Sequence, residues 1–167
     1  MTQIIYLFLD VDGVLNKESD WKTPFSLDRS CVKALADFAA KTKWECRIVL
    51  ISTWRAGVGR SASGYQREST EPYPSGNSRQ YDRLCRGLEE YGLSIYDTTP
   101  ISDKGRQAEV EFYIRRHQVE DYIVIDDDLS MYDEPGRLVF YAPDYRTGFT
   151  REDVKKALKQ LWKFKKR

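Results

Sequence analysis

The sequence lacks the long hydrophobic segments that carry a protein into or across a membrane. Its only apolar run near the N-terminus, residues 4–9, contains a tyrosine and is followed by two aspartates. A membrane-spanning helix needs about 20 consecutive apolar residues, and a secretory signal peptide needs a longer apolar core than this run provides. We therefore expect a soluble, cytoplasmic protein that does not bind membranes.

Cysteine and histidine are scarce as well, which limits the kinds of site that the chain can build. The three cysteines, Cys31, Cys46 and Cys85, are widely spaced and form no Cys-x-x-Cys pair. This pattern argues against both a disulfide framework and a zinc site. The single histidine, His117, lies at the end of an apolar helical stripe, so we interpret it as a structural residue.

The chain also lacks an excess of charge, so no overall field identifies a polyanionic partner. The net charge is +1 over 167 residues. From position 155 onward the chain carries lysines and an arginine but no acid. Such a cluster can bind nucleic acid, but cations near a helix C-terminus also suit the helix dipole, and we favour the second interpretation. The length suits one domain with its own core, which we assign to residues 1–167.

Two carboxylates follow the first apolar run. Residues 4–9 predict a buried strand, and Asp10, Asp12 and Gly13 come directly after it. Buried parallel strands place their chemistry at their carboxyl ends. Carboxylates this close repel each other unless a cation neutralises them, and Mg²⁺, which takes oxygen ligands, is the simplest candidate. Taken alone, the same residues are also typical of a strand end with a simple turn.

Two hydroxyl residues follow the second predicted strand, residues 47–51. This strand ends in Ser52 and Thr53, ahead of Arg55. A hydroxyl at this place could orient a phosphate oxygen, or it could cap a turn. Residues 56–80, rich in glycine, proline and serine, predict an irregular loop beside the site. Its arginines and tyrosines suit a surface that binds phosphates and bases, although for any single arginine we favour solvated loop charge.

A second acidic cluster follows a later strand. Strands are predicted at residues 93–96, 122–125 and 138–141, with a helix over 106–117 between the first two. The alternation predicts an α/β fold with a central, mostly parallel sheet of about five strands. Asp126, Asp127 and Asp128 come directly after the strand at 122–125. Three consecutive aspartates repel strongly, and a bound metal ion would explain them.

The order of these motifs resembles the haloacid dehalogenase (HAD) superfamily of phosphohydrolases. The stretches that carry the resemblance are Leu-Phe-Leu-Asp-Val-Asp-Gly-Val-Leu-Asn, Ile-Ser-Thr-Trp-Arg, Lys-Gly-Arg and Val-Ile-Asp-Asp-Asp, within residues 5–128. Their finer pattern is similar to the HAD domain of Swiss Army Knife RNA-repair proteins. The resemblance implies a Rossmann-like three-layer sandwich and a Mg²⁺-dependent phosphatase. It also implies a phosphorylated substrate, with RNA or DNA ends and nucleotides as candidates.

The resemblance also implies roles for individual residues. Asp10 would be the nucleophile that forms an aspartyl-phosphate, and Asp12 the general acid and then base. Lys104 would balance the charge of the nucleophile and the phosphoryl group. Substrate binding would fall to Ser52, Thr53, Arg55 and Arg106, and Mg²⁺ binding to Asp10, Asp12 through its backbone carbonyl, Asp126 and Asp127.

Two assignments stay open, and the sequence lacks one common feature of the superfamily. Arg106 could replace Lys104 because both precede the same helix, and the sequence does not say which of the three consecutive aspartates binds metal directly. Many HAD enzymes carry a folded cap domain, but neither segment between the motifs reads as a domain. An open site favours a large substrate and makes the loop from Arg55 to Arg79 the candidate specificity element.

Two other functions share parts of this pattern. A two-component receiver domain also combines aspartates, a hydroxyl and a lysine on an α/β sheet. Its hydroxyl comes late in the chain, whereas Ser52 comes second in this sequence. A non-catalytic module that binds phosphate or nucleic acid on a HAD fold is the second alternative. Against it, every residue type that catalysis requires is present.

Overall fold

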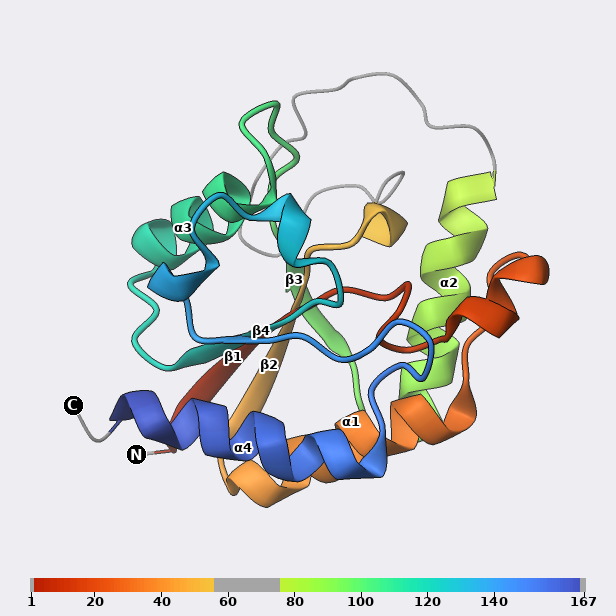
Figure 1. Cartoon of the computed structure of the whole chain (residues 1–167), viewed down its shortest axis with the longest axis horizontal. Helices are drawn as coiled ribbons and strands as arrows, with labels where there is room; N and C mark the ends of the chain where they lie inside the picture. Colours follow the sequence, from red (N-terminus) through yellow and green to blue (C-terminus); the bar gives the residue numbers. More distant parts are fainter. Residues whose placement is uncertain (1, 56–75, 166–167) are drawn as a thin grey trace.

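The fold is built on one sheet of parallel strands, which crosses the middle of the molecule (Figure 1). The computed structural model describes residues 2–55 and 76–165. The strands are β1 (Ile4–Leu9), β2 (Glu45–Leu50), β3 (Ile95–Thr98), β4 (Tyr122–Ile125) and β5 (Phe140–Tyr141). They stand in the order β3-β2-β1-β4-β5, and every neighbouring pair is parallel.

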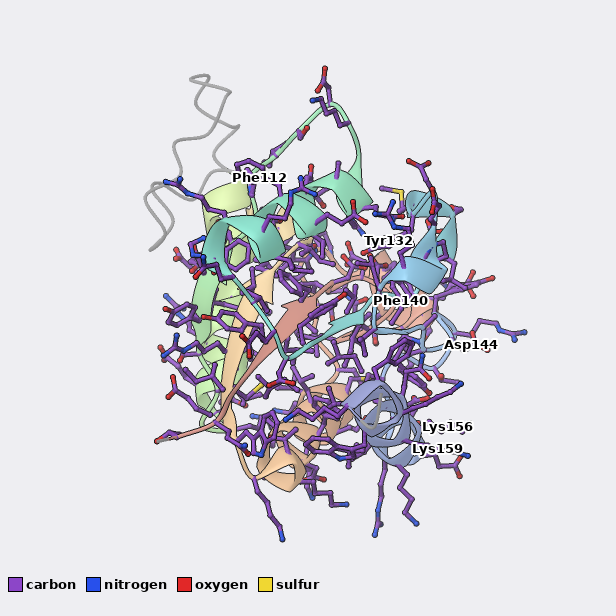
Figure 2. The ribbon with its side chains drawn as sticks, turned by 90° about the vertical axis from the view of Figure 1, so that its left-hand side faces the viewer. Phe112, Tyr132, Phe140, Asp144, Lys156 and Lys159 are labelled. Carbon is purple, nitrogen blue, oxygen red and sulfur yellow. The ribbon has the colours of Figure 1, made fainter. Side chains whose placement is uncertain are left out.

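Helices cover both faces of the sheet. They are α1 (Arg29–Thr42), α2 (Gly76–Glu89), α3 (Arg106–His117) and α4 (Arg151–Lys165). One core contains residues of α1, α2 and α4, and the other contains residues of α3. Figure 2 shows Phe112 of α3 on one side of the sheet and Lys156 of α4 on the other. This arrangement confirms the predicted Rossmann-like α/β sandwich. None of the helices that the structure describes has the length and apolar composition to span a bilayer.

Successive residues of the central strand β1 face opposite cores. Leu7 and Leu9 belong to the core beneath α1, α2 and α4, whereas Phe8 belongs to the core beneath α3. All three side chains are completely buried. Because alternate side chains of a strand point to opposite faces, a central strand that is covered on both sides must be apolar throughout. The first charged residue, Asp10, therefore marks the end of the strand.

Two predicted strands begin later than their apolar residues suggest. Leu93 was expected in β3, but its backbone N–H donates to the carbonyl of Leu88 and closes the end of α2, with Gly92 at a φ of +74°. This is a Schellman-type helix end, in which the apolar residue after the glycine packs back on the helix. Leu138 similarly donates to the carbonyl of Pro135 and so ends a short 3₁₀ turn before β5.

The predicted loop over residues 56–80 was too long at its carboxyl end. Residues 76–80 form the first part of α2, which begins at Gly76. They include no apolar residue, so hydrophobic periodicity gives no sign of a helix until Leu84 and Leu88, both of which are completely buried. The rest of the predicted loop, residues 56–75, lies outside the described residues.

The order of the strands places the carboxyl ends of β1 and β4 at the point where the chain changes direction across the sheet. From β1 the chain proceeds to β2 and β3 on one side, and β4 and β5 lie on the other. Open parallel sheets bind their ligands at this switch point, outside the carboxyl ends of the strands. Leu9 pairs with Ile125 in the register of β1 and β4. The next residues, Asp10 and Asp126, therefore emerge side by side.

Candidate active site

Three carboxylates gather at the ends of β1 and β4. Asp10, Asp126 and Asp127 each offer an oxygen that lies within 4.8 Å of the other two. Asp126 is completely buried, Asp10 is 6% exposed and Asp127 is half-buried. Burial and then the charge of Asp126 raise the pKa of Asp10 well above its usual range. Burial also raises the pKa of Asp127 to about 6. The structure thus brings together the three side chains that the sequence suggested as metal ligands.

Hydrogen bonds hold the side chain of Asp126 in place, whereas the side chain of Asp128 has a different partner. The hydroxyl of Tyr132 donates to Oδ2 of Asp126 at 2.7 Å, and the backbone N–H of Asp128 donates to Oδ1 at 3.0 Å. The side chain of Asp128 instead caps the 3₁₀ helix η3 (Leu129–Met131) by accepting a hydrogen bond from the Ser130 N–H at 3.0 Å. Of the three consecutive aspartates, Asp128 is therefore the one outside the carboxylate group.

Arg106, at the first position of α3, reaches the carboxylates. Its Nη1 lies 2.8 Å from Oδ2 of Asp126 and 3.5 Å from Oδ1 of Asp10. Burial alone would lower the pKa of Arg106, but the charges of Asp10 and Asp126 raise it overall. Lys104 lies in the turn before α3 with an exposed side chain, and the described residues include no ion pair that it makes. The cation beside the carboxylates is therefore Arg106.

Asp12 has different surroundings from Asp10. Its side chain is exposed and lies outside the group of three carboxylates. Its Oδ1 accepts a hydrogen bond from Nδ2 of Asn16 at 2.9 Å, and its Oδ2 accepts one from Nε1 of Trp54 at 3.1 Å. Asp10 and Asp12 both follow the end of β1, so their side chains need not point to the same face as alternate residues of a strand do. Two carboxylates that are neighbours in sequence thus have separate partners, one buried with acids and one exposed with neutral donors.

Asn16 organises the segment around Asp12, and sequence reasoning gave it no role. It is 2% exposed, and besides holding Asp12 its Nδ2 donates to the carbonyl of Ser26 at 3.1 Å. Its Oδ1 accepts hydrogen bonds from the N–H of Gly13 at 3.0 Å and from Nε1 of Trp21 at 2.9 Å. A buried side-chain amide needs all of these partners. The signal in the sequence was an asparagine directly after apolar residues.

The residues after β2 separate into one buried hydroxyl, one exposed hydroxyl and one buried cation. Ser52 is 1% exposed, and its Oγ accepts a hydrogen bond from the Trp54 N–H at 3.2 Å. Within residues 2–55 and 76–165 its own hydroxyl donates no hydrogen bond, which leaves it able to donate to a ligand. Thr53 is exposed. Of the two hydroxyls after β2, the structure therefore favours Ser52 over Thr53 as the one that could orient a phosphate oxygen.

Arg55 requires a correction, because it was expected to contact substrate. It is 4% exposed, and its guanidinium donates to the backbone carbonyls of Ile51 and Ser52 and to Oε2 of Glu109, the last at 2.6 Å. Glu109 in turn accepts from the N–H of Ser102 at 2.8 Å. Burial lowers the pKa of Arg55, and the charge of Glu109 partly offsets this effect. Arg55 therefore ties the end of β2 to α3.

A family model supplies the observation that identifies the fold family. The model described as the HAD domain in Swiss Army Knife RNA repair proteins matches residues 6–154. The chain belongs to this family. A search of curated proteins found no match. The HAD domain places this chain in a family of the phosphohydrolase type, and the match spans all the residues described above around the carboxylates.

The carboxylate group of this HAD domain fits a hard divalent cation. Three carboxylates face a single guanidinium, so the described residues leave negative charge uncompensated at a partly buried site. Oxygen atoms of this kind are the ligands that Mg²⁺ prefers. A divalent ion would offset both causes of the raised pKa of Asp10, which are burial and then the charge of Asp126. Asp10, Asp126 and Asp127 could therefore hold the metal on which HAD enzymes depend.

Gly13 allows the segment that follows β1 to lie close to the side chain of Asp127, which follows β4. A Cβ atom at this position would overlap Cγ and Oδ2 of Asp127, and the backbone φ is +78°. We expect Gly13→Ala to lower the free energy of unfolding by about 1–3 kcal/mol more than Gly92→Ala, because overpacking adds to the cost of the positive φ. Gly92 is the matched control, since its φ is +74° and a Cβ there would meet nothing within 4 Å. Urea denaturation of both variants measures the difference, and equal losses would show that Asp127 does not need the space.

Proposed function

We propose that this HAD domain is a Mg²⁺-dependent phosphomonoesterase that works through an aspartyl-phosphate on Asp10. The observation that supports it best is the separation of two neighbouring carboxylates. Asp10 is buried against Asp126, Asp127 and Arg106, whereas Asp12 is exposed on neutral donors. A nucleophile requires charge-compensating partners, and an acid or base requires access to the leaving group and to water.

In the first step, an oxygen of Asp10 attacks phosphorus and the bond between phosphorus and the ester oxygen breaks. Asp12 gives its proton to that oxygen, which leaves as an alcohol. In the second step, Asp12 takes a proton from water, the water oxygen attacks phosphorus, and phosphate and free Asp10 result. Bound Mg²⁺ would supply positive charge to the phosphoryl oxygens. Arg106 and the Ser52 hydroxyl would hold those oxygens, since phosphoryl transfer depends mainly on positioning and charge neutralisation.

The proposed substrates are phosphorylated RNA or DNA ends, or nucleotides. The family to which the chain belongs is described by its occurrence in RNA repair proteins. The segment between β1 and α1 contains one short 3₁₀ helix, η1 (Glu18–Lys22), and no folded cap. A phosphate at the end of an RNA or DNA strand can therefore approach Asp12 from the side of the segment between β1 and α1.

A phosphate-release screen tests the proposed function. The panel contains RNA and DNA oligonucleotides with 5′-phosphate, 3′-phosphate or cyclic-phosphate ends, free mononucleotides and p-nitrophenyl phosphate, each with Mg²⁺ and with chelator. A preparation of Asp10→Asn purified in the same way measures contaminating phosphatase. We expect Mg²⁺-dependent release from at least one phosphomonoester above that background. Release from none of them would refute the enzyme assignment.

The roles of Arg106 and Lys104 can be separated by a matched pair of variants. We expect Arg106→Ala to lower kcat/KM by about 10- to 100-fold, the loss that follows when a hydrogen bond to a charged group is removed. Lys104→Ala should stay within about twofold of the unaltered chain, as most surface substitutions do, because its side chain is exposed. Initial rates on the best substrate of the screen measure both. A large loss in Lys104→Ala alone would reverse the assignment.

A further inference from the structure

A cavity of about 370 Å³ lies directly beside Asp12. Its size falls within the range of small-molecule sites. It is formed between the segment that follows β1 and the segment that follows β2, and Gln80 of α2 completes it. The residues that line it are Asp12, Asn16, Asp20, Trp21, Thr23, Pro24, Phe25, Ser26, Trp54 and Gln80. Three of them are aromatic, and none of them carries a positive charge.

Trp21 presents a fixed indole to this cavity. Its side chain is 46% exposed, although its Nε1 is tied to Oδ1 of Asn16 at 2.9 Å. The ring stacks on that of Tyr145, with centroids 6.0 Å apart and planes at 20°. The backbone N–H of Glu18 also donates to the carbonyl of Tyr145 at 3.0 Å. This bond joins the segment of Trp21 to the segment before α4 that contains Tyr145. A large aromatic surface held in this way beside a polar site is typical of a stacking platform.

Phe25 also lines the cavity and has an unusual backbone. Its φ is +58°, a left-handed conformation that costs about 1–3 kcal/mol for a residue other than glycine. Its ring packs edge-on against Trp54, with centroids 6.3 Å apart. Trp54 in turn holds Asp12. Phe25, Trp54 and Asp12 are therefore joined by direct contacts and form one packed unit.

We propose that this cavity binds the nucleoside from which the phosphate is removed, with the base stacked on Trp21. The inference rests on the proposed function and names its leaving group. The ester oxygen must lie within hydrogen-bond reach of Asp12 to receive its proton, so the group that carries this oxygen must extend into the space beside Asp12. Because the described residues that line that space include Asp12 and Asp20 but no cation, it favours a neutral planar group over a further phosphate.

Two substrates that differ only by a base test this inference. They are oligonucleotides whose terminal residue, normal or abasic, carries the phosphate that the unaltered chain removes. We expect Trp21→Ala to lower kcat/KM for the normal end by about 5- to 100-fold, the range found when a stacked base loses its aromatic partner. The abasic end should change by less than about twofold. Phe164→Ala is the control, since Phe164 is 37% exposed on α4 and should affect neither substrate.

The comparison also separates stacking from an effect through Asp12. Trp21 holds Asn16, which holds Asp12, so a disturbed acid would slow both substrates equally and would overturn the inference. Unchanged rates on both substrates would overturn it as well. Trp21→Phe, which keeps an aromatic face but loses the N–H, should restore most of the preference for the normal end. If the unaltered chain released phosphate from neither oligonucleotide but did so from another phosphomonoester of the screen, the proposed function would stand and the stacking inference would be overturned; release from no member of the screen would refute both.

Discussion

The Asp10→Asn variant is expected to release phosphate at least about 10³-fold more slowly than the unaltered chain, as happens when a nucleophile is removed. An amide cannot attack phosphorus to form an acyl-phosphate, so the covalent route is lost and not merely slowed. The same change replaces one of the three carboxylates that could hold Mg²⁺ by a neutral amide. Release of phosphate from the best substrate of the screen, followed with enzyme in excess, measures the loss.

The fold should survive this substitution. Asp10, Asp126 and Asp127 place three carboxylates within 4.8 Å of one another around one guanidinium, and removing one negative charge reduces their repulsion. We therefore expect a melting temperature, measured without metal, that is equal to or above that of the unaltered chain. Asp128→Asn is the matched control, because asparagine can still cap η3. A loss of activity in this control as large as that in Asp10→Asn would contradict the division among the aspartates.

The sequence was sufficient to find the carboxylate group because the group depends on strand ends. The apolar runs that end at Leu9 and Ile125 are local signals, and they locate Asp10 and Asp126 without knowledge of the order of the strands. The register of β1 and β4 then places Asp10 next to Asp126, since Leu9 pairs with Ile125. Buried parallel strands are apolar by necessity, so the position where polarity begins is readable from the chain alone.

Contacts between distant segments were beyond the reach of sequence patterns. The resemblance to HAD enzymes made Arg55 a candidate phosphate ligand, but its side chain is bound to Glu109, 54 positions away. Lys104 lies in the turn before α3 and Arg106 begins the helix, and only the structure shows that Arg106 reaches the carboxylates whereas Lys104 is exposed. A charged residue near a site can serve the fold or the substrate, and the choice depends on which partners are buried with it.

Asp12→Asn should lower kcat/KM on a nucleotide or oligonucleotide phosphate by at least about 10²-fold, the usual contribution of a positioned acid or base. The loss should be smaller on p-nitrophenyl phosphate, because p-nitrophenolate leaves readily without a proton and only the second step then needs Asp12. Asparagine preserves the shape of the side chain and can still accept a hydrogen bond from Asn16 or from Trp54, but not from both. Because the side chain is exposed, we expect a retained fold with a modest loss of stability.

The dependence on the leaving group is what distinguishes a proton donor from a residue that only organises the site. If Asp12 merely held Asn16 and Trp54, the variant would slow the release from both kinds of ester by the same factor. Asp103→Asn, an exposed aspartate in the turn before α3, controls for a general effect of lost charge. Equal losses on the two substrates would therefore reassign Asp12 to positioning, and a near-neutral effect on both would remove it from the mechanism. A larger loss on the ester with the poor leaving group than on p-nitrophenyl phosphate is the result that only proton transfer explains.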